Sequence, residues 1–321
     1  MTGRLRILTW HVHGNYLYSL TQLPHDFIVP VMQDGRTGYG ALGPKIPWGP
    51  NVRMVPAEAV CNEPLDCIIY QSRSAFEADR FSLLTPTQRA LPSVYIEHNP
   101  PEPHPTDTRH FFRHGRGVLV HVTDYNALMW DSAGMPWVVI QHGIPEQRGV
   151  RYSGELEKGI VVINHLARRG RRVGADVYEA MRTHTPLDLI GMGAEEMPGG
   201  KGEIPNMDVG AYMARYRYFF SPIRYASLGL SLVEAMMVGM PVIGVAATEL
   251  GQVVKNGVNG YVDYRLPRLV DAAHALLADP DLARAWGAEA RATALERFGI
   301  RRFVDDWNRV LADITGDSYG N

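Results

Sequence analysis

Short apolar runs follow one another along the first half of the chain. They are rich in Val and Ile and bounded by Pro, Gly or Asp, and they cover residues 5–12, 26–32, 65–72, 93–98, 117–123 and 136–143. Most are continuously apolar rather than alternating, which is typical of strands covered on both faces in a parallel sheet. The stretch 99–116 has four prolines in seven residues, which exclude regular structure there.

The second half has the same organisation, with clearer helices between the runs. We expect strands at 159–164, 187–193, 218–222 and 241–246, and helices at 175–184, 209–216, 231–239, 268–279 and 282–298. Regular alternation of strand and helix predicts parallel βαβ units. The sequence therefore predicts an α/β protein of two Rossmann-like domains, 1–148 and 149–300. A polar, Gly-rich hinge is expected at 143–159, and a C-terminal helix, 301–315, is expected to pack back on the first domain.

Composition excludes several classes of protein. A chain of 321 residues is long enough for two domains, and 45% hydrophobic residues exclude dominant disorder. The net charge of −2 gives no footprint for nucleic acid. The apolar stretch 227–247 contains Glu234, Gly239 and Pro241, so it indicates a buried helix and strand and not a transmembrane segment. With two cysteines and no signal-peptide pattern at the start, we expect a cytoplasmic protein.

One turn between a strand and a helix is a candidate anion site. Gly229, Leu230 and Ser231 should present free backbone amides at a helix N-terminus, where the helix dipole favours an anion. Glu234 lies one turn later, and a carboxylate beside a phosphate site is suited to binding a ribose diol. The alternative is that Glu234 only stabilises the first turn of its helix.

The same stretch resembles a family signature. Residues 222–244, PIRYASLGLSLVEAMMVGMPVIG, are similar to the pattern P-S-x-Y-E-G-F-G-L-x-x-x-E-A-M-A-x-G-x-P-V of retaining family 4 glycosyltransferases, which have the GT-B fold. The matching positions are Pro222, Tyr225, Gly229, Leu230, Glu234, Ala235, Met236, Gly239, Pro241 and Val242. Residues 248–262 resemble the following pattern, G-G-x-x-E-x-V-x-x-G-x-x-G-x-L-V, with Gln252 at its Glu. The resemblance covers residues 158–311 and implies two Rossmann-like domains facing across a cleft.

It also implies a donor site. The family's Arg falls on His165, or on Arg168 if the loop is one residue shorter, and its Lys falls on Arg169. Both cations would bind the diphosphate. Gly193 ends the G-x-G strand before the base site, and Ile204 lies in a short strand, 201–205, whose backbone would read the base. The first Glu of the E-x7-E motif is replaced by Ala226, which weakens the case for sugar recognition more than that for nucleotide binding.

In the first domain the resemblance implies one catalytic histidine. His98 ends a strand, where side chains face the ligand crevice of an open α/β sheet, although a structural histidine is the rival interpretation. Gly14 and Asn15, in the loop after the first strand, are candidates for contact with the donor phosphates or the acceptor.

We expect no metal and no cofactor. The spacings of His104, His110 and His114 do not fit a zinc site, no D-x-D follows a strand, and no G-x-G-x-x-G opens a helix after the first strand. The expected function is transfer of a sugar from a nucleotide-diphosphate sugar, with retention, to a glycan or lipid-linked acceptor. Peripheral membrane contact is compatible with such an acceptor. A catalytically weak nucleotide- or glycan-binding subunit and a sugar-nucleotide epimerase are the alternatives.

Overall fold

The protein divides into two compact units in a computed structural model that describes residues 3–44, 46–147 and 149–316. Unit 1 comprises the residues up to Gly143 together with those from Ile300 onward, and unit 2 comprises Ile144–Gly299. The boundary predicted at 148/149 lies slightly further along the chain, and position 148 is outside the described residues.

Unit 1 is built on a parallel sheet in the strand order β3-β2-β1-β4-β5-β6-β7. The strands are β1 (Arg6–Thr9), β2 (Asp26–Val31), β3 (Val52–Pro56), β4 (Cys67–Tyr70), β5 (Ser93–Glu97), β6 (Gly117–His121) and β7 (Trp137–Val139). The helices are α1 (Gly14–Leu20), α2 (Arg80–Leu83), α3 (Pro86–Arg89), α4 (Asp124–Met129) and α12 (Ile300–Thr315). A 3-10 turn (Ala57–Asn62) and a π-helical turn (Ala75–Asp79) complete the unit.

Burial explains which strands the pattern predicted. The central strands β4 and β5 are buried at every position, in agreement with their continuous apolar runs. Strand β3 was not predicted: it lies at an edge of the sheet, and only Val55 of its five residues is buried. The first strand is shorter than expected, because the chain leaves the sheet after Thr9.

Unit 2 is built on a second parallel sheet, in the order β12-β11-β10-β8-β9. The strands are β8 (Leu156–Val162), β9 (Leu187–Ile190), β10 (Tyr216–Ser221), β11 (Val242–Val245) and β12 (Gly260–Asp263). The helices are α5 (Leu166–Arg169), α6 (Ala175–Arg182), α7 (Val209–Met213), α8 (Leu230–Val238), α9 (Leu250–Val253), α10 (Leu266–Ala278) and α11 (Pro280–Phe298). Strand β8 includes the end of the predicted hinge, and the predicted strand at 201–205 is absent, because that segment has no regular structure.

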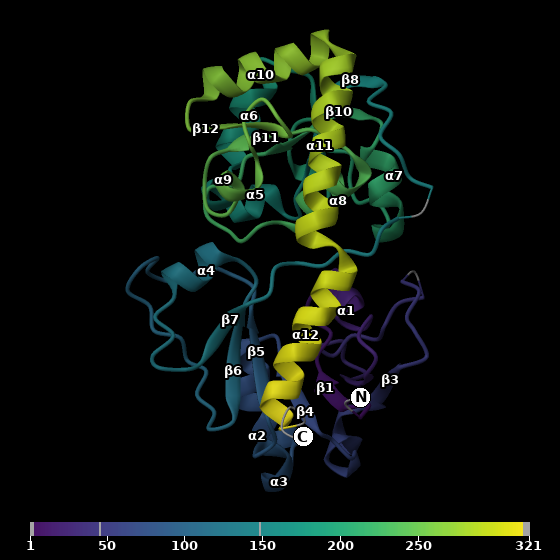
Figure 1. The fold of residues 1–321 in the computed structure, drawn as a ribbon, viewed down its shortest axis with the longest axis vertical. Coiled ribbons are helices and arrows are strands. Elements are labelled where there is room, and N and C mark those ends of the chain that lie inside the picture. The colour runs from purple at the N-terminus through teal and green to yellow at the C-terminus, as the bar shows by residue number, and fades with distance from the viewer. Residues whose placement is uncertain (1–2, 45, 148, 317–321) are drawn as a thin grey trace. The chain divides into compact units, whose positions relative to one another are not determined.

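The apolar stretch 227–247 is a buried helix followed by a strand, as its pattern indicates. Helix α8 ends at Gly239, which has φ 98°, and β11 begins at Val242. Helix α11 runs beside α8 (Figure 1), where a Cβ on Gly287 would lie 2.0 Å from the carbonyl oxygen of Gly239. In the part of the chain that the structure describes, no helix combines the length and apolarity needed to cross a membrane.

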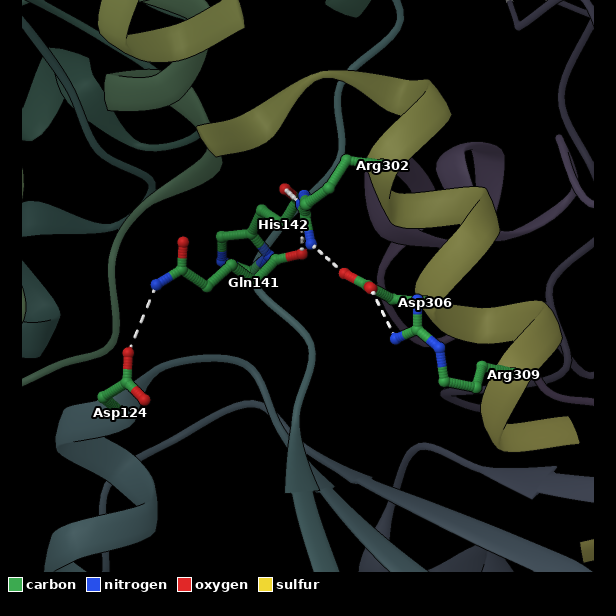
Figure 2. Close-up of polar contacts among 6 residues, drawn as sticks. All are labelled: Asp124, Gln141, His142, Arg302, Asp306 and Arg309. Carbon is green, nitrogen blue, oxygen red and sulfur yellow. Dashed lines mark hydrogen bonds and ion pairs between the residues drawn. The ribbon is translucent and has the colours of Figure 1, made fainter. Parts of the chain in front are cut away.

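Hydrogen bonds connect helix α12 to the segment that follows β7 (Figure 2). The Arg302 guanidinium donates hydrogen bonds to the carbonyl oxygens of Gln141, at 2.8 Å, and His142, at 2.5 Å. It also pairs with Asp306 at 2.8 Å. A Cβ on Gly143 would collide with the Phe303 side chain, so only glycine fits this approach. The last helix therefore forms part of the core of unit 1.

Candidate active site

A pocket opens at the carboxyl ends of β8 and β10 in unit 2. The chain continues from β8 to β9 on one side of the sheet and returns to β10 on the other, so the pocket lies at the point where the strand order reverses. Open α/β sheets bind ligands at this place. No charged side chain lines the pocket among the described residues; the lining residues are Val162, Ile163, Phe219, Phe220, Ser221, Ile223, Ser227, Leu228, Gly229, Ser231, Leu232, Ala247, Thr248 and Leu250.

The N-terminus of α8 forms one wall of this pocket. Gly229 is the N-cap residue and provides no side-chain cap. Within the described residues, the amides of Gly229, Leu230 and Ser231 donate to no protein acceptor, which leaves them available to an anion. A Cβ on Gly229 would contact only the Ser231 hydroxyl, at 3.7 Å, and its φ of −69° suits any residue. The protein fold therefore does not require glycine here, whereas close approach of a ligand would.

The three predicted residues of α8, Leu230, Ser231 and Glu234, have different surroundings. The Ser231 hydroxyl donates to the carbonyl oxygen of Val162 at 3.1 Å, which links α8 to the end of β8. Leu230 packs its side chain against the hydrophobic core, so only its backbone is available to a ligand. Glu234, half-buried, follows one turn later and does not line the pocket.

The basic loop predicted after β8 is helical: Arg168 and Arg169 end α5, and Arg171 and Arg172 lie in a 3-10 turn (Gly170–Val173). The two pairs of arginines have different surroundings. Arg171 forms an ion pair with Asp176 at 2.5 Å, and Arg172 donates to the carbonyl oxygen of Tyr225 at 3.0 Å, so both hold the loop in place. Arg168 and Arg169 are exposed, and neither guanidinium bonds to another of the described residues. Although Arg169 is exposed, the protein around its guanidinium displaces part of the water, and this desolvation, followed by the charge of Arg168, lowers its pKa. Arg169 remains a cation at neutral pH because the pKa of arginine is so high.

Backbone contacts bring this loop close to the pocket. Gly174 has φ 84°, and a Cβ there would lie 2.0 Å from the carbonyl oxygen of Pro222. Arg224 and Tyr225 both donate backbone hydrogen bonds to the carbonyl oxygen of Arg172. The loop therefore packs directly on the segment that leads into Gly229.

His165 and Gly193 lie side by side at the ends of β8 and β9. His165 adopts the left-handed conformation, with φ 53°, and its amide donates to the carbonyl oxygen of Met192 at 2.7 Å. A Cβ on Gly193 would lie 3.0 Å from the His165 ring nitrogen Nδ1. Ile204 packs its side chain against the core of unit 2. None of the three lines the pocket.

Ala226 is 7% exposed, at the position where the family pattern has a carboxylate. An alanine here contributes no charge and no hydrogen bond. The sequence analysis missed Thr248, which lines the pocket with φ 51°, a conformation that is rare for a β-branched residue. The signal was present, because the quoted pattern begins with two glycines where this chain has Thr248 and Glu249.

In unit 1, His98 directly follows β5 and lies in a cluster of rings. Its ring centroid is 4.4 Å from that of His13 and 4.7 Å from that of Tyr16, and its Nε2 lies 3.3 Å from the Gln71 amide oxygen. Burial, and then the neighbouring His13 and His142, holds the pKa of His98 well below its usual value. The imidazole is therefore neutral at pH 7.

Gly14 and Asn15 are the first two residues of α1, so the sequence analysis was wrong to place them in a loop. The carbonyl oxygen of Asn15 accepts a hydrogen bond from the Ser19 hydroxyl at 3.2 Å. Sequence reasoning also missed His13 and His142, which reach the cluster from separate segments. Among the described residues, no three His, Cys, Asp or Glu side chains are grouped so that they could hold a metal ion.

Comparison with known proteins identifies part of unit 2. Residues 199–293 match the family model described as "Glycosyl transferases group 1". This segment is similar to the glycosyl transferases group 1 family, and the match covers less than half of the chain. Over 93 residues the chain is 32% identical to N-acetyl-alpha-D-glucosaminyl L-malate synthase of Bacillus anthracis, covering 28% of this chain and 24% of that one. Over 189 residues it is 22% identical to alpha-D-kanosaminyltransferase of Streptomyces kanamyceticus, covering 54% and 48%. The matches thus span half or less of each relative's length.

Solved structures extend the fold comparison to nearly the whole chain. A sucrose-phosphate synthase from Thermosynechococcus elongatus superimposes with a TM-score of 0.74 at 14% identity, covering 98% of this chain and 100% of that one. HepE of Anabaena, solved with UDP and glucose, gives 0.70 at 14% identity, covering 96% and 100%. The predicted α/β class with two parallel sheets of the GT-B type is confirmed.

Proposed function

We propose that the protein is a glycosyltransferase that moves a sugar from a nucleotide-diphosphate sugar to a glycan or lipid-linked acceptor, with retention and without a metal. The observation that carries this proposal is the set of free amides of Gly229, Leu230 and Ser231 at the pocket wall, within a segment similar to the glycosyl transferases group 1 family. The Anabaena neighbour, solved with UDP-glucose, favours the same class of donor.

In this proposal the diphosphate binds at the N-terminus of α8. The amides and the helix dipole stabilise its negative charge, and the unpaired guanidiniums of Arg168 and Arg169 add two cations. This is the charge stabilisation that a metal would otherwise supply to a departing diphosphate. Glu234 accepts hydrogen bonds from the ribose diol, and the departing phosphate takes the acceptor's proton. Neutral His98 donates a hydrogen bond to the sugar or to the acceptor.

A thermal-shift panel tests the donor site. UDP, GDP, ADP and dTDP, with their common sugar conjugates, are added with and without EDTA. A ligand that binds only the folded protein raises its Tm by mass action. We expect one nucleotide diphosphate to raise Tm, and EDTA to leave the shift unchanged. The absence of a shift with every nucleotide would overturn the donor site, and a shift abolished by EDTA would overturn metal independence.

Glu234→Ala refines the assignment within that site. A carboxylate that binds ribose contributes to binding of the nucleotide but not of inorganic diphosphate. We expect the variant to weaken the selected nucleotide diphosphate about tenfold, in keeping with loss of hydrogen bonds to a charged group, while leaving the affinity for inorganic diphosphate as in the wild type. Equal loss for both ligands would remove the ribose role.

One observation favours a second candidate function. Buried, uncharged Ala226 replaces a carboxylate of the family pattern, which favours a subunit that binds the nucleotide but transfers little sugar. Incubation of the donor that raises Tm with a panel of glycan and lipid-linked acceptors distinguishes the two: product formation favours the transferase, and binding with no turnover favours the subunit.

A further inference from the structure

One residue of the pocket in unit 2 combines a strained backbone with an amide and a hydroxyl that bond to none of the described residues. Thr248 lines the pocket with φ 51°. A positive φ places the Cβ of a β-branched residue too close to its own backbone, so this conformation lasts only where the surroundings impose it. Within the described chain, neither its amide nor its hydroxyl forms a hydrogen bond.

The residues on both sides of Thr248 hold it in this conformation. The amide of Ala247 donates to the carbonyl oxygen of Val245 at 2.7 Å, and the amide of Leu250 donates to the carbonyl oxygen of Ala247 at 3.2 Å. The Glu249 side chain, 2% exposed, pairs with Arg297 of α11 at 3.5 Å. Arg297 also donates to the carbonyl oxygen of Gln252 at 2.6 Å. The turn is therefore fixed on both sides of the strained residue.

The fold itself gains nothing visible from a threonine at this position. Glycine adopts a positive φ without strain, and a threonine that made no contact would be replaced by glycine with a gain in stability. The strained residue lies at the pocket wall, and strained residues cluster at active sites and ligand clamps, where the strain is part of the mechanism. Its hydroxyl both donates and accepts hydrogen bonds, as do the hydroxyls of a sugar.

We infer that Thr248 is a specificity-determining residue that binds the glycosyl group of the donor through its hydroxyl and backbone amide. This inference rests on the proposed function, since it places a nucleotide sugar in the pocket. Ala226 supports this role of Thr248. With no carboxylate at position 226 and no charged side chain on the described pocket lining, a sugar must be bound by neutral groups. Thr248 is a neutral group with both a donor and an acceptor available.

Three variants separate the roles of the side chain. Thr248→Val keeps the volume, the β-branch and the strain but removes the hydroxyl. Thr248→Ser keeps the hydroxyl. Thr248→Gly removes the side chain and the strain. Thr183→Val is the matched control, because Thr183 is exposed in the same unit and its hydroxyl donates to the carbonyl oxygen of Ala180 at the end of α6.

Calorimetric Kd values for UDP and UDP-glucose, GDP and GDP-mannose, ADP and ADP-glucose, and dTDP and dTDP-glucose provide the test. For the pair that binds wild type, we expect Thr248→Val to weaken the nucleotide sugar about tenfold, the loss of one net hydrogen bond. The Kd of the free nucleotide diphosphate should stay within twofold, and Thr248→Ser should retain the affinity for the nucleotide sugar. Thr248→Gly should bind the sugar conjugate as weakly as Thr248→Val, with a Tm equal to or above that of wild type.

Each other result has a defined meaning. If Thr248→Val binds the nucleotide sugar as wild type does, or if it weakens the free diphosphate equally, the inference is overturned while the donor site stands. A fall in Tm for Thr248→Gly would assign the threonine to the fold and also overturn it. If wild type binds none of the eight ligands, the proposed function fails, and the inference with it.

Discussion

Different functional groups lie at the carboxyl edges of the two sheets. In unit 2 the edge offers free backbone amides at Gly229–Ser231 and unpaired guanidiniums at Arg168 and Arg169, all suited to an anion. In unit 1 the edge gathers imidazoles from His13, His98 and His142 around Tyr16. Burial keeps His13 and His98 uncharged, since it lowers the pKa of each. The same architecture thus supplies positive charge at one edge and neutral hydrogen-bonding groups at the other.

The largest expected effect is a loss of stability in unit 1 when a ring that packs against the imidazole cluster is removed. Phe303 of α12 is fully buried, with its ring 5.7 Å from Tyr16. Phe303→Ala leaves a cavity there, and we expect it to lower the free energy of unfolding of unit 1 by about 3–5 kcal/mol. Urea unfolding followed by hydrogen exchange measures this for each unit separately. Equal loss of protection at β4 and β10 would contradict a defect confined to unit 1.

The next effect in size is a loss of diphosphate affinity when positive charge is removed from unit 2. Arg168→Ala with Arg169→Ala removes both unpaired guanidiniums, and we expect a loss of about 100-fold in affinity for inorganic diphosphate and for the nucleotide diphosphate, from two charge-assisted contacts. Arg171→Ala is the matched control: it breaks an exposed ion pair with Asp176, so it should cost about 0–1 kcal/mol of stability and leave diphosphate affinity within twofold. Calorimetry measures the affinities. Equal losses in the two variants would argue against this division of the loop.

A smaller effect distinguishes the units by pH. His121 is fully buried, and within the described residues its ring nitrogens have no hydrogen-bond partner; burial and then His110 lower its pKa to about 4. Below pH 6.5 the His121 imidazole binds a proton in the unfolded chain, whereas in folded unit 1 it stays neutral until the pH approaches 4. Stability is therefore lost as the pH falls from about 6.5 towards 4, by about 1.4 kcal/mol per pH unit for each such histidine.

Urea unfolding at pH 7.5, 6 and 5 measures this slope. His121→Gln should reduce the slope by one proton's worth between pH 6 and 5, whereas the same change at exposed His104 should leave it as it is. A slope unaffected by His121→Gln would show that this imidazole takes no part in the acid sensitivity of unit 1.

The contrast between the two edges also explains how far the sequence could predict them. The helix N-terminus of the site in unit 2 and Glu234 lie in one stretch, 222–244, so their pattern could be recognised along the chain, whereas the rest of the pocket lining comes from other segments. The buried strands of both sheets were predicted because their apolar runs are continuous. Strand β3, Val52–Pro56, was missed because Arg53 interrupts its short apolar run.

The imidazole cluster could not be predicted, because its members come from three distant segments and nothing in their spacing along the chain brings them together. Gly14 and Asn15 were misplaced because glycine was taken as the mark of a loop, although α1 begins at that glycine. The division of the arginines depends on Asp176 and on the carbonyl oxygen of Tyr225, which only the folded loop brings within reach.

The membership of α12 in unit 1 has a consequence for synthesis on the ribosome. Residues 144–299 are contiguous, so unit 2 is complete as soon as its last helix has emerged. The first segment of unit 1 is translated before unit 2 but lacks Phe303 and Trp307 until α12 emerges. Until then these two side chains cannot cover Tyr16. Domains translated first usually fold first. Here the segment of unit 1 that precedes unit 2 gains its missing helix only after unit 2 has been synthesised, so unit 1 cannot complete its core before unit 2.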